Sequence, residues 1–567
     1  MRPGREGSGA GGSAARGVPA RVAEIEAELL APGGPFELEV ADVLGSPVRQ
    51  LRRRAPSLGA LLDHSRGFGE TPYLCFTDGV DTSVLTYAEH ARRAAALAAH
   101  LRDRFGLRPG DRVAILGANS PEWVIACFAI VSAGAVAVGL NAWWTAAELR
   151  FALSDAEPRL LLCDRRRLER LGEPGVPTLV LDEDTAALPD AELPGVDLAE
   201  DDPALMLYTS GTTGRPKAAV HSHRNVSALL GLQGFMAHRA ARLAPAAAGA
   251  PPPCPLVTSP LFHVSGLHTA AIALLGAGVR SVWWRGRFDP GRVLATIERE
   301  RVTGWGYTQA LLHRLVHHPG VAGHDLSSVR TLGGGGSPIP PALQARAREL
   351  FPNARPTLAV GYGSTECTAL ATLAFGEELL THPTSVGRPL PGIELEIRDD
   401  DGHAVAEGAE GTVWVRGPTV MLGYFRRPRE NAETIGPGRW LCTGDVGRLE
   451  AGRLFLHARR RDLILRGGEN VYPAEIEARL EEHPDVAEAA VLGVSHPELG
   501  QAVKAIVVPR SGAHPDPVTL STFCAEALAY FKVPAQWEIR TDALPRNAMG
   551  KVLKEVLRGA DSAFVED

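Results

Sequence analysis

The chain has 567 residues, 45% of them hydrophobic and 22% charged, which is ordinary for a globular protein but too long for one ordinary domain. Its 59 basic and 66 acidic side chains give a formal net charge of −7, which argues against a general binder of nucleic acid or of anionic membranes. Seven cysteines without a Cys-x-x-Cys pair argue against a disulfide scaffold or a zinc module and indicate a reducing, cytoplasmic location.

Residues 1–20 are rich in Gly, Ala and Ser, and no apolar run follows them. This composition predicts a disordered tail and argues against a signal peptide. From about residue 111 to residue 200, strand and helix patterns alternate, which predicts a parallel sheet covered by helices. The expected strands are 111–119, 135–141 and 159–164, and the expected helices are 120–134 and 145–157.

The stretch from Trp123 to Thr145 carries no charge and is long enough to suggest a membrane span. It is rich in Ala and Gly, however, and a helix-start signal, Asn-Ser-Pro-Glu-Trp, leads into it. A buried helix that leads into a buried strand is therefore the better prediction, and no transmembrane segment is expected.

The alternating pattern resumes at residues 255–285, after a Pro/Ala-rich loop at 242–255. From Gly387 onward, short alternating strands are joined by Gly and Asp turns, and a smaller mixed segment follows Asp462. The sequence predicts an α/β fold whose large N-terminal body contains parallel-sheet subdomains and a small β-barrel-like subdomain, followed by a small α+β domain. The expected boundaries are 1–20 for the tail, 21–458 for the body, 459–461 for a hinge and 462–567 for a mobile C-terminal domain.

The segment LYTSGTTGRPKAAVHSH, Leu207 to His223, is unusually dense in small hydroxyl residues. It is not a Walker A loop, because the order Gly-x-x-x-x-Gly-Lys-Ser/Thr is absent. Its glycines still let backbone amides turn toward an anion, its hydroxyls can donate to phosphate oxygens, and its lysine supplies charge. The segment predicts a phosphate-binding loop formed by Thr209, Ser210, Gly211, Thr212, Thr213, Gly214 and Lys217.

This loop resembles the phosphate-binding signature of the acyl-adenylate-forming enzymes, which include acyl-CoA synthetases, adenylation domains of peptide synthetases and beetle luciferases. The resemblance extends over the chain from about residue 55 to about residue 555. Within the family, the sequence as a whole is most similar to bacterial fatty-acyl-CoA ligases. The resemblance implies ATP and Mg²⁺ as cofactors, coenzyme A as a co-substrate and a small-molecule carboxylic acid as substrate.

The resemblance assigns roles to three motifs of the body. In PLFHVSG, His263 follows Phe262 at the wall of the acyl pocket; by itself such a histidine would more often be a core or surface residue. In LGGGGSPIP, the backbones of Gly335, Gly336 and Ser337 lie along adenine. In GYGSTE, Tyr362 stacks on adenine, Gly363 belongs to the same turn, Thr365 touches the α-phosphate and Glu366 holds Mg²⁺.

The resemblance also assigns roles near the C-terminus. Asp445 in WLCTGDVGRLE accepts both ribose hydroxyls, and Arg459 makes a second ribose contact. Arg461 falls at the hinge, where relatives more often have Asp or Lys, and Ala458 stands where they have Gly. Gly467 and Gly468 are expected to pack against the thioester-forming tunnel after domain rotation.

Lys551, in LPRNAMGKVLK, matches the catalytic lysine of the family, although alone it would be read as an exposed residue near a C-terminus. By resemblance it stabilises the charge that develops at the α-phosphate as pyrophosphate leaves. The catalytic set expected for this chain is Lys551, Glu366, His263 and Lys217.

Two other patterns are set aside. His313, His317, His318 and His324 cluster, and the spacing of the first two could hold a metal, but no Glu or Cys completes a zincin arrangement. No Gly-x-Ser-x-Gly elbow is present, which argues against an α/β-hydrolase.

The implied reaction is the ATP-dependent ligation of a carboxylic acid to coenzyme A through an acyl-adenylate. Amino-acid-activating relatives place an aspartate where this chain has His263, so a free α-amino acid is disfavoured and a fatty or other aliphatic acid is expected. Four aromatic residues either narrow the pocket toward aryl acids or belong to the core: Tyr307, Trp305, Trp283 and Trp284.

Two alternatives to this reaction stay open. The adenylate could pass to an amine or to a separate carrier protein, or the chain could be a non-catalytic acyl- or nucleotide-binding protein. The intact Lys551, Glu366, Asp445 and Lys217 argue against the latter. Monomer and homodimer both fit the sequence.

Overall fold

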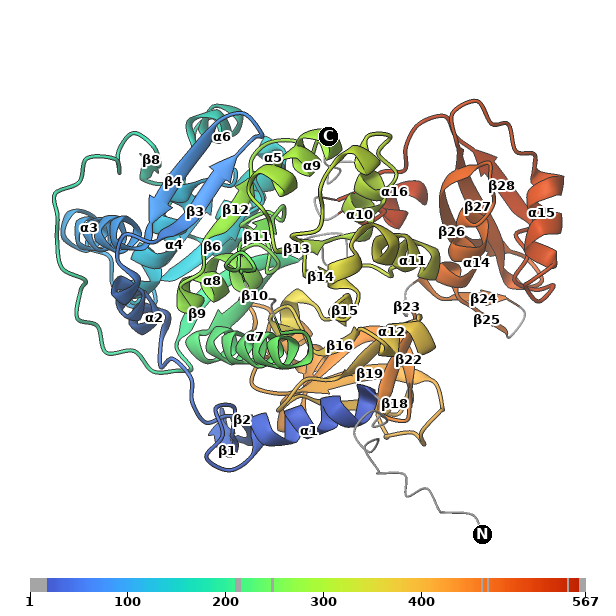
Figure 1. The fold of residues 1–567 in the computed structure, drawn as a ribbon, viewed down its shortest axis with the longest axis horizontal. Coiled ribbons are helices and arrows are strands. Elements are labelled where there is room, and N and C mark those ends of the chain that lie inside the picture. The colour runs from blue at the N-terminus through green and yellow to red at the C-terminus, as the bar shows by residue number, and fades with distance from the viewer. Residues whose placement is uncertain are drawn as a thin grey trace, which may run out of the picture.

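The computed structural model describes residues 18–209, 216–245, 249–459, 462–466, 469–547 and 550–559. The N-terminal body is built around two large sheets, and a smaller sheet with its own helices forms the C-terminal part (Figure 1). The α-helices are α1 (Val18–Leu30), α2 (Leu58–Ser65), α3 (Tyr87–Phe105), α4 (Pro121–Ser132), α5 (Ala146–Ala156), α6 (Arg165–Leu171), α7 (His223–Leu243), α8 (Ala273–Ala277), α9 (Pro290–Arg299), α10 (Gln309–Val316), α11 (Pro341–Leu350), α12 (Glu378–Thr381), α13 (Pro428–Thr434), α14 (Pro473–Glu481), α15 (Pro517–Ala525) and α16 (Lys554–Leu557).

The first sheet runs parallel from β9 to β8, and β10 and β20 extend it antiparallel. Its order is β20 (Gly423–Tyr424), β10 (Lys217–Ser222), β9 (Pro203–Thr209), β6 (Val136–Leu140), β5 (Arg112–Leu116), β7 (Leu160–Cys163) and β8 (Thr178–Val180). This is the parallel sheet that the alternating pattern of the sequence predicts.

The uncharged stretch from Trp123 to Thr145 forms the buried helix α4 and the buried strand β6, as predicted. Ser120 caps α4 by accepting a hydrogen bond from the Trp123 amide, and Pro121 occupies its first turn. Gly134, with φ +78°, makes the turn into β6. No helix in the described part of the chain is long and apolar enough to cross a bilayer.

The second sheet is larger and changes character along its length. Its strands β3, β12, β11, β13, β14 and β15 are parallel to one another, and its strands from β16 to β18 are antiparallel. The antiparallel part contains the short strands that the sequence predicts after Gly387. The order is β18 (Glu394–Arg398), β19 (Gly411–Arg416), β22 (Trp440–Glu450), β23 (Arg453–Arg459), β17 (Ser385–Pro389), β16 (Thr372–Phe375), β15 (Ala359–Tyr362), β14 (Thr331–Gly334), β13 (Gly304–Tyr307), β11 (Pro255–Val257), β12 (Ser281–Trp284), β3 (Pro72–Thr77) and β4 (Thr82–Thr86), with β21 (Ile435–Gly436) beside β22.

The C-terminal part is α+β. Its described strands are β25 (Glu469–Val471), β24 (Ile464–Arg466), β27 (Gly500–Pro509), β26 (Val486–His496) and β28 (Gln536–Ile539), and α14 and α15 pack on one side of this sheet. Figure 1 shows this part in orange and red at one end of the molecule. A small hairpin of β1 (Leu38–Val43) and β2 (Ser46–Leu51) follows α1.

Candidate active site

The phosphate-binding segment joins β9 to β10. Thr209 and Lys217 are register partners across this antiparallel pair, so the two ends of the segment lie side by side. Ser210, Gly211, Thr212, Thr213 and Gly214 lie outside the described residues. The Lys217 ammonium lies 5.1 Å from the ring centroid of Tyr424, close enough for a cation–π contact.

Tyr424 connects Lys217 to Glu366. Its hydroxyl donates a 2.7 Å hydrogen bond to Oε1 of Glu366, so one aromatic side chain contacts both the predicted lysine and the predicted metal ligand. Tyr424 is not among the residues predicted from the sequence, because a tyrosine between Gly423 and an apolar neighbour is not distinguishable from a core aromatic residue. Its pairing with β10 brings it to the site.

The backbone around Glu366 is held from several directions. Glu366 lies in a short 3₁₀ turn, Thr365–Cys367, directly after β15. Thr368 and Ala369 follow with positive φ angles of 55° and 91°, which non-glycine residues rarely adopt. The Met421 amide donates to the Glu366 carbonyl at 2.9 Å. Contacts of this kind keep the strained turn in one conformation.

A buried histidine supports the same turn from behind. Nε2 of His221 lies 2.7 Å from the Thr365 carbonyl oxygen. Burial lowers the pKa of His221 to about 4, so its imidazole is neutral near pH 7 and Nε2 carries the proton that the carbonyl accepts. The His268 ring packs edge-on against His221 at 4.9 Å.

Tyr362 and Asp445, the residues predicted to contact adenine and ribose, lie in contact with each other. The Tyr362 hydroxyl donates a 2.7 Å hydrogen bond to Oδ2 of Asp445. Asp445 is the register partner of Arg459 on β23, so the two predicted ribose contacts are neighbours in the sheet. The side chain of Arg459, like Arg461, Gly467 and Gly468, lies outside what the structure describes.

The glycine-rich segment packs backbone to backbone with the GYGSTE turn. A Cβ on Gly335 would lie 2.9 Å from the Gly361 carbonyl oxygen, and one on Gly363 would lie 2.0 Å from that of Ala369. Gly336 has φ +79°. Gly335, Gly336 and Ser337 therefore follow β14 at the same edge as the residues after β13 and β15. Ligands of parallel sheets bind at such an edge, where strands end at their carboxyl ends.

His263 follows β11 at this edge. Its ring contacts Phe262 at 4.8 Å, and Phe262 packs in turn against Trp143 at 5.4 Å. The Nε2 atom of His263 is buried without a hydrogen-bond partner among the described residues. Burial lowers the pKa of His263 to about 4, so the side chain is neutral near pH 7.

One row of the large sheet has two neighbouring positions without side chains. Gly306 and Gly333 are register partners on β13 and β14, and both are exposed although they lie in the middle of the sheet. A Cβ at either position would meet no described atom within 4 Å. Val257 and Ala359 flank them in the same row and are buried. The two glycines therefore leave an open stretch of sheet surface between two apolar neighbours.

A π-helix belongs to the core on this side of the sheet. Val257 lies in the core cluster that contains Leu267, Ala270 and Ala271. These three residues lie in the π-helix η2 (Leu267–Ile272), a rare form that is frequent at functional sites. Val257 thus belongs to the same core as the π-helix and pairs with the exposed Gly306 in the sheet.

The aromatic residues that could have narrowed the pocket belong to the cores instead. Trp305 and Tyr307 alternate with Gly306 and face the other side of the sheet, where Trp284 also packs. Their core positions are stabilised by the hydrogen bonds from Trp305 Nε1 to Thr258 Oγ1 at 3.1 Å and from Trp284 Nε1 to the Arg287 carbonyl at 3.0 Å. Trp283 is fully buried and donates to Ser281 Oγ at 2.9 Å.

The loop of Lys551 reaches the body at this edge. A Cβ on Gly550, the residue before Lys551, would lie 3.0 Å from Cβ of Ala310 and 3.7 Å from Oγ1 of Thr308. Thr308 follows β13 directly. The C-terminal part therefore brings Lys551 to the strand ends at which His263 and Glu366 lie.

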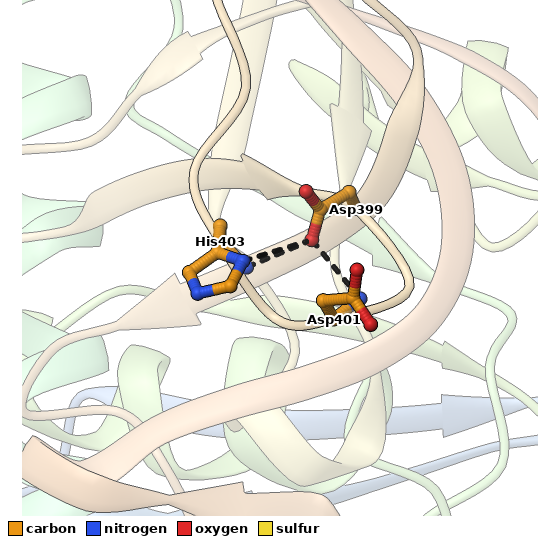
Figure 2. A group of neighbouring side chains, drawn as sticks. All are labelled: Asp399, Asp401 and His403. Atoms are coloured by element: carbon orange, nitrogen blue, oxygen red, sulfur yellow. Dashed lines mark hydrogen bonds and ion pairs between the residues drawn. The ribbon is translucent and has the colours of Figure 1, made fainter.

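Two possible metal sites lie elsewhere. Asp399, Asp401 and His403, the metal-capable group found among the described residues, are exposed on the turn that follows β18 (Figure 2). Asp399 Oδ1 accepts the Asp401 and His403 amides at 3.0 and 2.9 Å, so it serves the turn itself. The rings of His313 and His317 lie 4.3 Å apart on α10, but neither belongs to this metal-capable group.

Glu366 suits the predicted Mg²⁺. Carboxylate oxygens are hard ligands, and Mg²⁺ in nucleotide enzymes is commonly held by one or two carboxylates together with substrate phosphates. Lys217, which lies beside Glu366 through Tyr424, is the residue predicted to contact those phosphates. The residues present therefore fit a metal that arrives with ATP.

Comparison with known proteins shows the family of the chain. The "AMP-binding enzyme" family model matches residues 62–425, and the "AMP-binding enzyme C-terminal domain" model matches residues 475–551. A feruloyl-CoA synthase of Amycolatopsis sp. is 36% identical over 485 residues, which cover 84% of this chain and 94% of that protein.

Two solved structures share the fold over nearly the whole chain. The o-succinylbenzoate CoA synthetase MenE of Bacillus subtilis, bound to its acyl-adenylate, superposes with a TM-score of 0.76 and 31% identity, covering 90% of this chain and 99% of that one. The amide bond synthetase McbA of Marinactinospora thermotolerans gives a TM-score of 0.75 and 31% identity, covering 88% and 99%. The chain therefore belongs to the AMP-binding enzyme family, and it is an AMP-forming acid–CoA ligase that uses ATP, Mg²⁺ and coenzyme A.

Proposed function

We propose that the acid is an apolar monocarboxylic acid with a bulky chain, either aliphatic, as in a fatty acid, or ending in an aryl group. The observation that carries this proposal is the open stretch of sheet surface at Gly306 and Gly333. The neighbours of these glycines in the same row are Val257 and Ala359, so the row offers neither a charge nor a side-chain hydrogen bond. Such a surface favours apolar chains, whose burial contributes about 25 cal/mol per Å².

The neutral state of His263 supports the same class of acid. An amino acid would place its ammonium near this position, and a neutral imidazole offers no negative charge to pair with it. A neutral imidazole can instead pack against an apolar chain.

We assign the first half-reaction as follows. A carboxylate oxygen of the acid attacks the α-phosphorus of ATP, the bond to the β-phosphate oxygen breaks, and pyrophosphate leaves. Lys217 and the phosphate-binding segment bind the phosphates, and Tyr362 and Asp445 orient the nucleoside. Lys551 stabilises the charge that develops at the α-phosphate. Mg²⁺, held by Glu366 with the phosphates, would neutralise charge that otherwise repels the attacking carboxylate.

The second half-reaction follows a rotation of residues 462–567 about Arg461. The sulfur of coenzyme A attacks the acyl carbon, AMP leaves with the bonding electron pair, and the thiol proton is released. Gly467 and Gly468 are assigned to the passage for the pantetheine chain. Rotation lets one site serve both steps, because it removes Lys551 before the thiol enters. The seven free cysteines fit a reducing, cytoplasmic setting.

A second candidate acceptor is an amine, which the similarity to the amide bond synthetase McbA favours. Both candidates share the first half-reaction, so the acceptor must be tested separately. A carrier-protein thiol is chemically equivalent to coenzyme A in this respect.

The test is pyrophosphate release on a panel of acids from acetate to long aliphatic and arylalkanoic acids, with coenzyme A, a simple amine or neither. We expect release to be fastest with the bulky apolar acids and to yield a thioester. Preference for acetate or for an amino acid would refute the acid assignment. An amide product without any thioester would refute coenzyme A as the acceptor, and inactivity on every acid would favour a non-catalytic binding protein.

A further inference from the structure

The loop that carries Lys551 is tied to the rest of the C-terminal part by two ion pairs that flank the lysine. We propose that Arg546 and Lys554 are positioning residues, which set the Lys551 loop for adenylate formation through Glu488 and Glu477. The inference rests on the proposed role of Lys551, and it concerns residues outside the nucleotide and acyl contacts described above.

The backbone at Lys551 is fixed to Asn547. The Asn547 amide donates to the Lys551 carbonyl, and the Lys551 amide donates to Oδ1 of Asn547, both at 2.9 Å. Arg546 and Val552 form the antiparallel bridge that closes the loop. Any rotation of Asn547 is therefore transmitted to Lys551.

The N-terminal arm of the loop is oriented by Arg546. One nitrogen of its guanidinium donates to Oε2 of Glu488 on β26 at 2.7 Å, and another donates to the Gly550 carbonyl at 2.7 Å. One planar group thus joins the sheet to the residue that precedes Lys551. A guanidinium suits this task because its donors are held in a rigid fork.

The C-terminal arm is oriented by Lys554. Its ammonium lies 2.6 Å from Oε1 of Glu477 on α14, and the same oxygen accepts the Val491 amide of β26 at 2.8 Å. Glu477 therefore joins α14, β26 and the loop at one point.

These pairs are partly shielded from water, with 31% and 26% of the Arg546 and Glu488 side chains exposed and 17% and 21% of those of Lys554 and Glu477. Charge-assisted hydrogen bonds of this kind are stronger than fully exposed pairs. Apolar contacts attach the loop independently, because Val552 and Leu557 pack on the cluster that contains Leu492, Ile506 and Leu544. The ion pairs are thus suited to direct the loop, while the apolar contacts hold it.

The two ion pairs act on the Lys551 loop while this loop lies against the body, which is the conformation assigned to adenylate formation. A Cβ on Gly550 would lie 3.0 Å from Cβ of Ala310 on α10, so the Lys551 loop lies against this helix of the body. A loop that tilts away from Glu488 or Glu477 would therefore shift Lys551 relative to the strand ends of the body. A displacement of about 1 Å at a reacting centre can cost on the order of a hundredfold in rate.

The experiment measures the two half-reactions of the full chain separately: pyrophosphate release with ATP and acid, and thioester formation from a supplied acyl-adenylate with coenzyme A. Glu488→Gln and Glu477→Gln should each slow adenylate formation about tenfold at saturating ATP, and the double variant more, with thioester formation changed less than about twofold. Combining Lys554→Glu with Glu477→Lys should restore part of the rate, because the swap rebuilds the pair.

The matched control is Glu475→Gln, which removes a 2.7 Å pair with Lys532 from the same helix but away from the loop. It should leave both half-reactions unchanged. Equal loss of both half-reactions in Glu488→Gln and Glu477→Gln, or unchanged adenylate formation in the double variant, would overturn the proposal.

Lys551→Ala distinguishes the failure of this inference from that of the proposed function. If Lys551→Ala loses adenylate formation while the Glu variants do not, only the positioning inference fails. If Lys551→Ala retains adenylate formation, the role assigned to Lys551 fails and the positioning inference fails with it.

Discussion

The hydroxyl of Tyr424 donates a 2.7 Å hydrogen bond to Oε1 of Glu366, and the ring of the same tyrosine lies under the Lys217 ammonium. One side chain thus links the carboxylate assigned to Mg²⁺ with the lysine assigned to phosphate. This link makes Tyr424 the clearest site for a mutational test.

Tyr424→Phe keeps the ring under Lys217 and removes only the hydroxyl. Because Glu366 then loses one of its orienting bonds, we expect adenylate formation to slow about tenfold and to require a higher Mg²⁺ concentration. Stability should change by about 1 kcal/mol, the usual worth of one hydrogen bond.

A Mg²⁺ titration of pyrophosphate release measures this effect. Tyr208→Phe is the control, because Tyr208 also donates to a carboxylate, Asp155, at 3.1 Å, which Arg427 continues to pair. An unchanged Mg²⁺ dependence in Tyr424→Phe would show that the link does not orient the metal ligand.

Gly306→Phe should shorten the proposed acyl site at Gly306 and Gly333. The new ring would enter space where a Cβ meets no described atom within 4 Å, so we expect the chain to fold. Bulky acids should lose about tenfold or more in kcat/KM, while short acids should lose little.

The measurement is kcat/KM across the panel of acids, and Tyr307→Phe is the control for Gly306→Phe. Tyr307 is the next residue along β13 but faces the opposite core, so acid preference should stay as in the parent chain. If Gly306→Phe leaves the order of preferred acids unchanged, the sheet surface at Gly306 and Gly333 is not the acyl site.

Gly363→Ala should damage the site by displacing its backbone. The added Cβ would lie 2.0 Å from the Ala369 carbonyl oxygen, so the turn that carries Glu366 must move. We expect adenylate formation to fall by a factor of about a hundred or more, since that turn positions both Thr365 and Glu366.

Gly323→Ala, at a position where a Cβ meets no described atom, should behave like the parent chain in the same assay. Full activity in Gly363→Ala would mean that the turn relaxes without affecting Glu366.

Glu481 should make stability depend on pH. Burial, followed by the nearby charge of Glu477, raises the pKa of Glu481 from 4.5 to about 7, with Glu488 acting in the same direction and Arg546 opposing it. Between these values the folded chain keeps a proton that the unfolded chain has released, so this group's contribution to stability falls as pH rises from about 4.5 to 7 and is constant above.

The loss attributable to Glu481 is at most on the order of 3 to 4 kcal/mol, because each pKa unit corresponds to about 1.4 kcal/mol. Thermal unfolding between pH 5 and pH 8 should therefore show that Glu481→Gln raises the midpoint at pH 8 more than at pH 5. Glu482→Gln, an exposed neighbour on the same helix end, controls for loss of one charge. Parallel pH curves for Glu481→Gln and the parent chain would contradict the prediction.

Much of the fold could be predicted from the sequence because its signals are local. The helix-start pattern before Trp123, the unbroken apolar run and Gly134 specify a buried helix, a turn and a buried strand without reference to distant residues. The motifs around Glu366, Asp445 and Lys551 are also local, since each needs several residue types at fixed spacing. Sequence alone thus determined the α/β class and the family, and it identified most of the candidate site.

The tertiary structure decided which of these residues meet. Tyr424 lies 58 positions from Glu366 and Asp445 lies 83 from Tyr362, so the contacts depend on strand order rather than on spacing. Register alone places Gly306 beside Gly333 and turns Trp305 and Tyr307 into the opposite core. The physical reason is that side-chain periodicity along a strand determines which residues share a face. Which distant strands and helices contact that face depends on how the whole sheet packs.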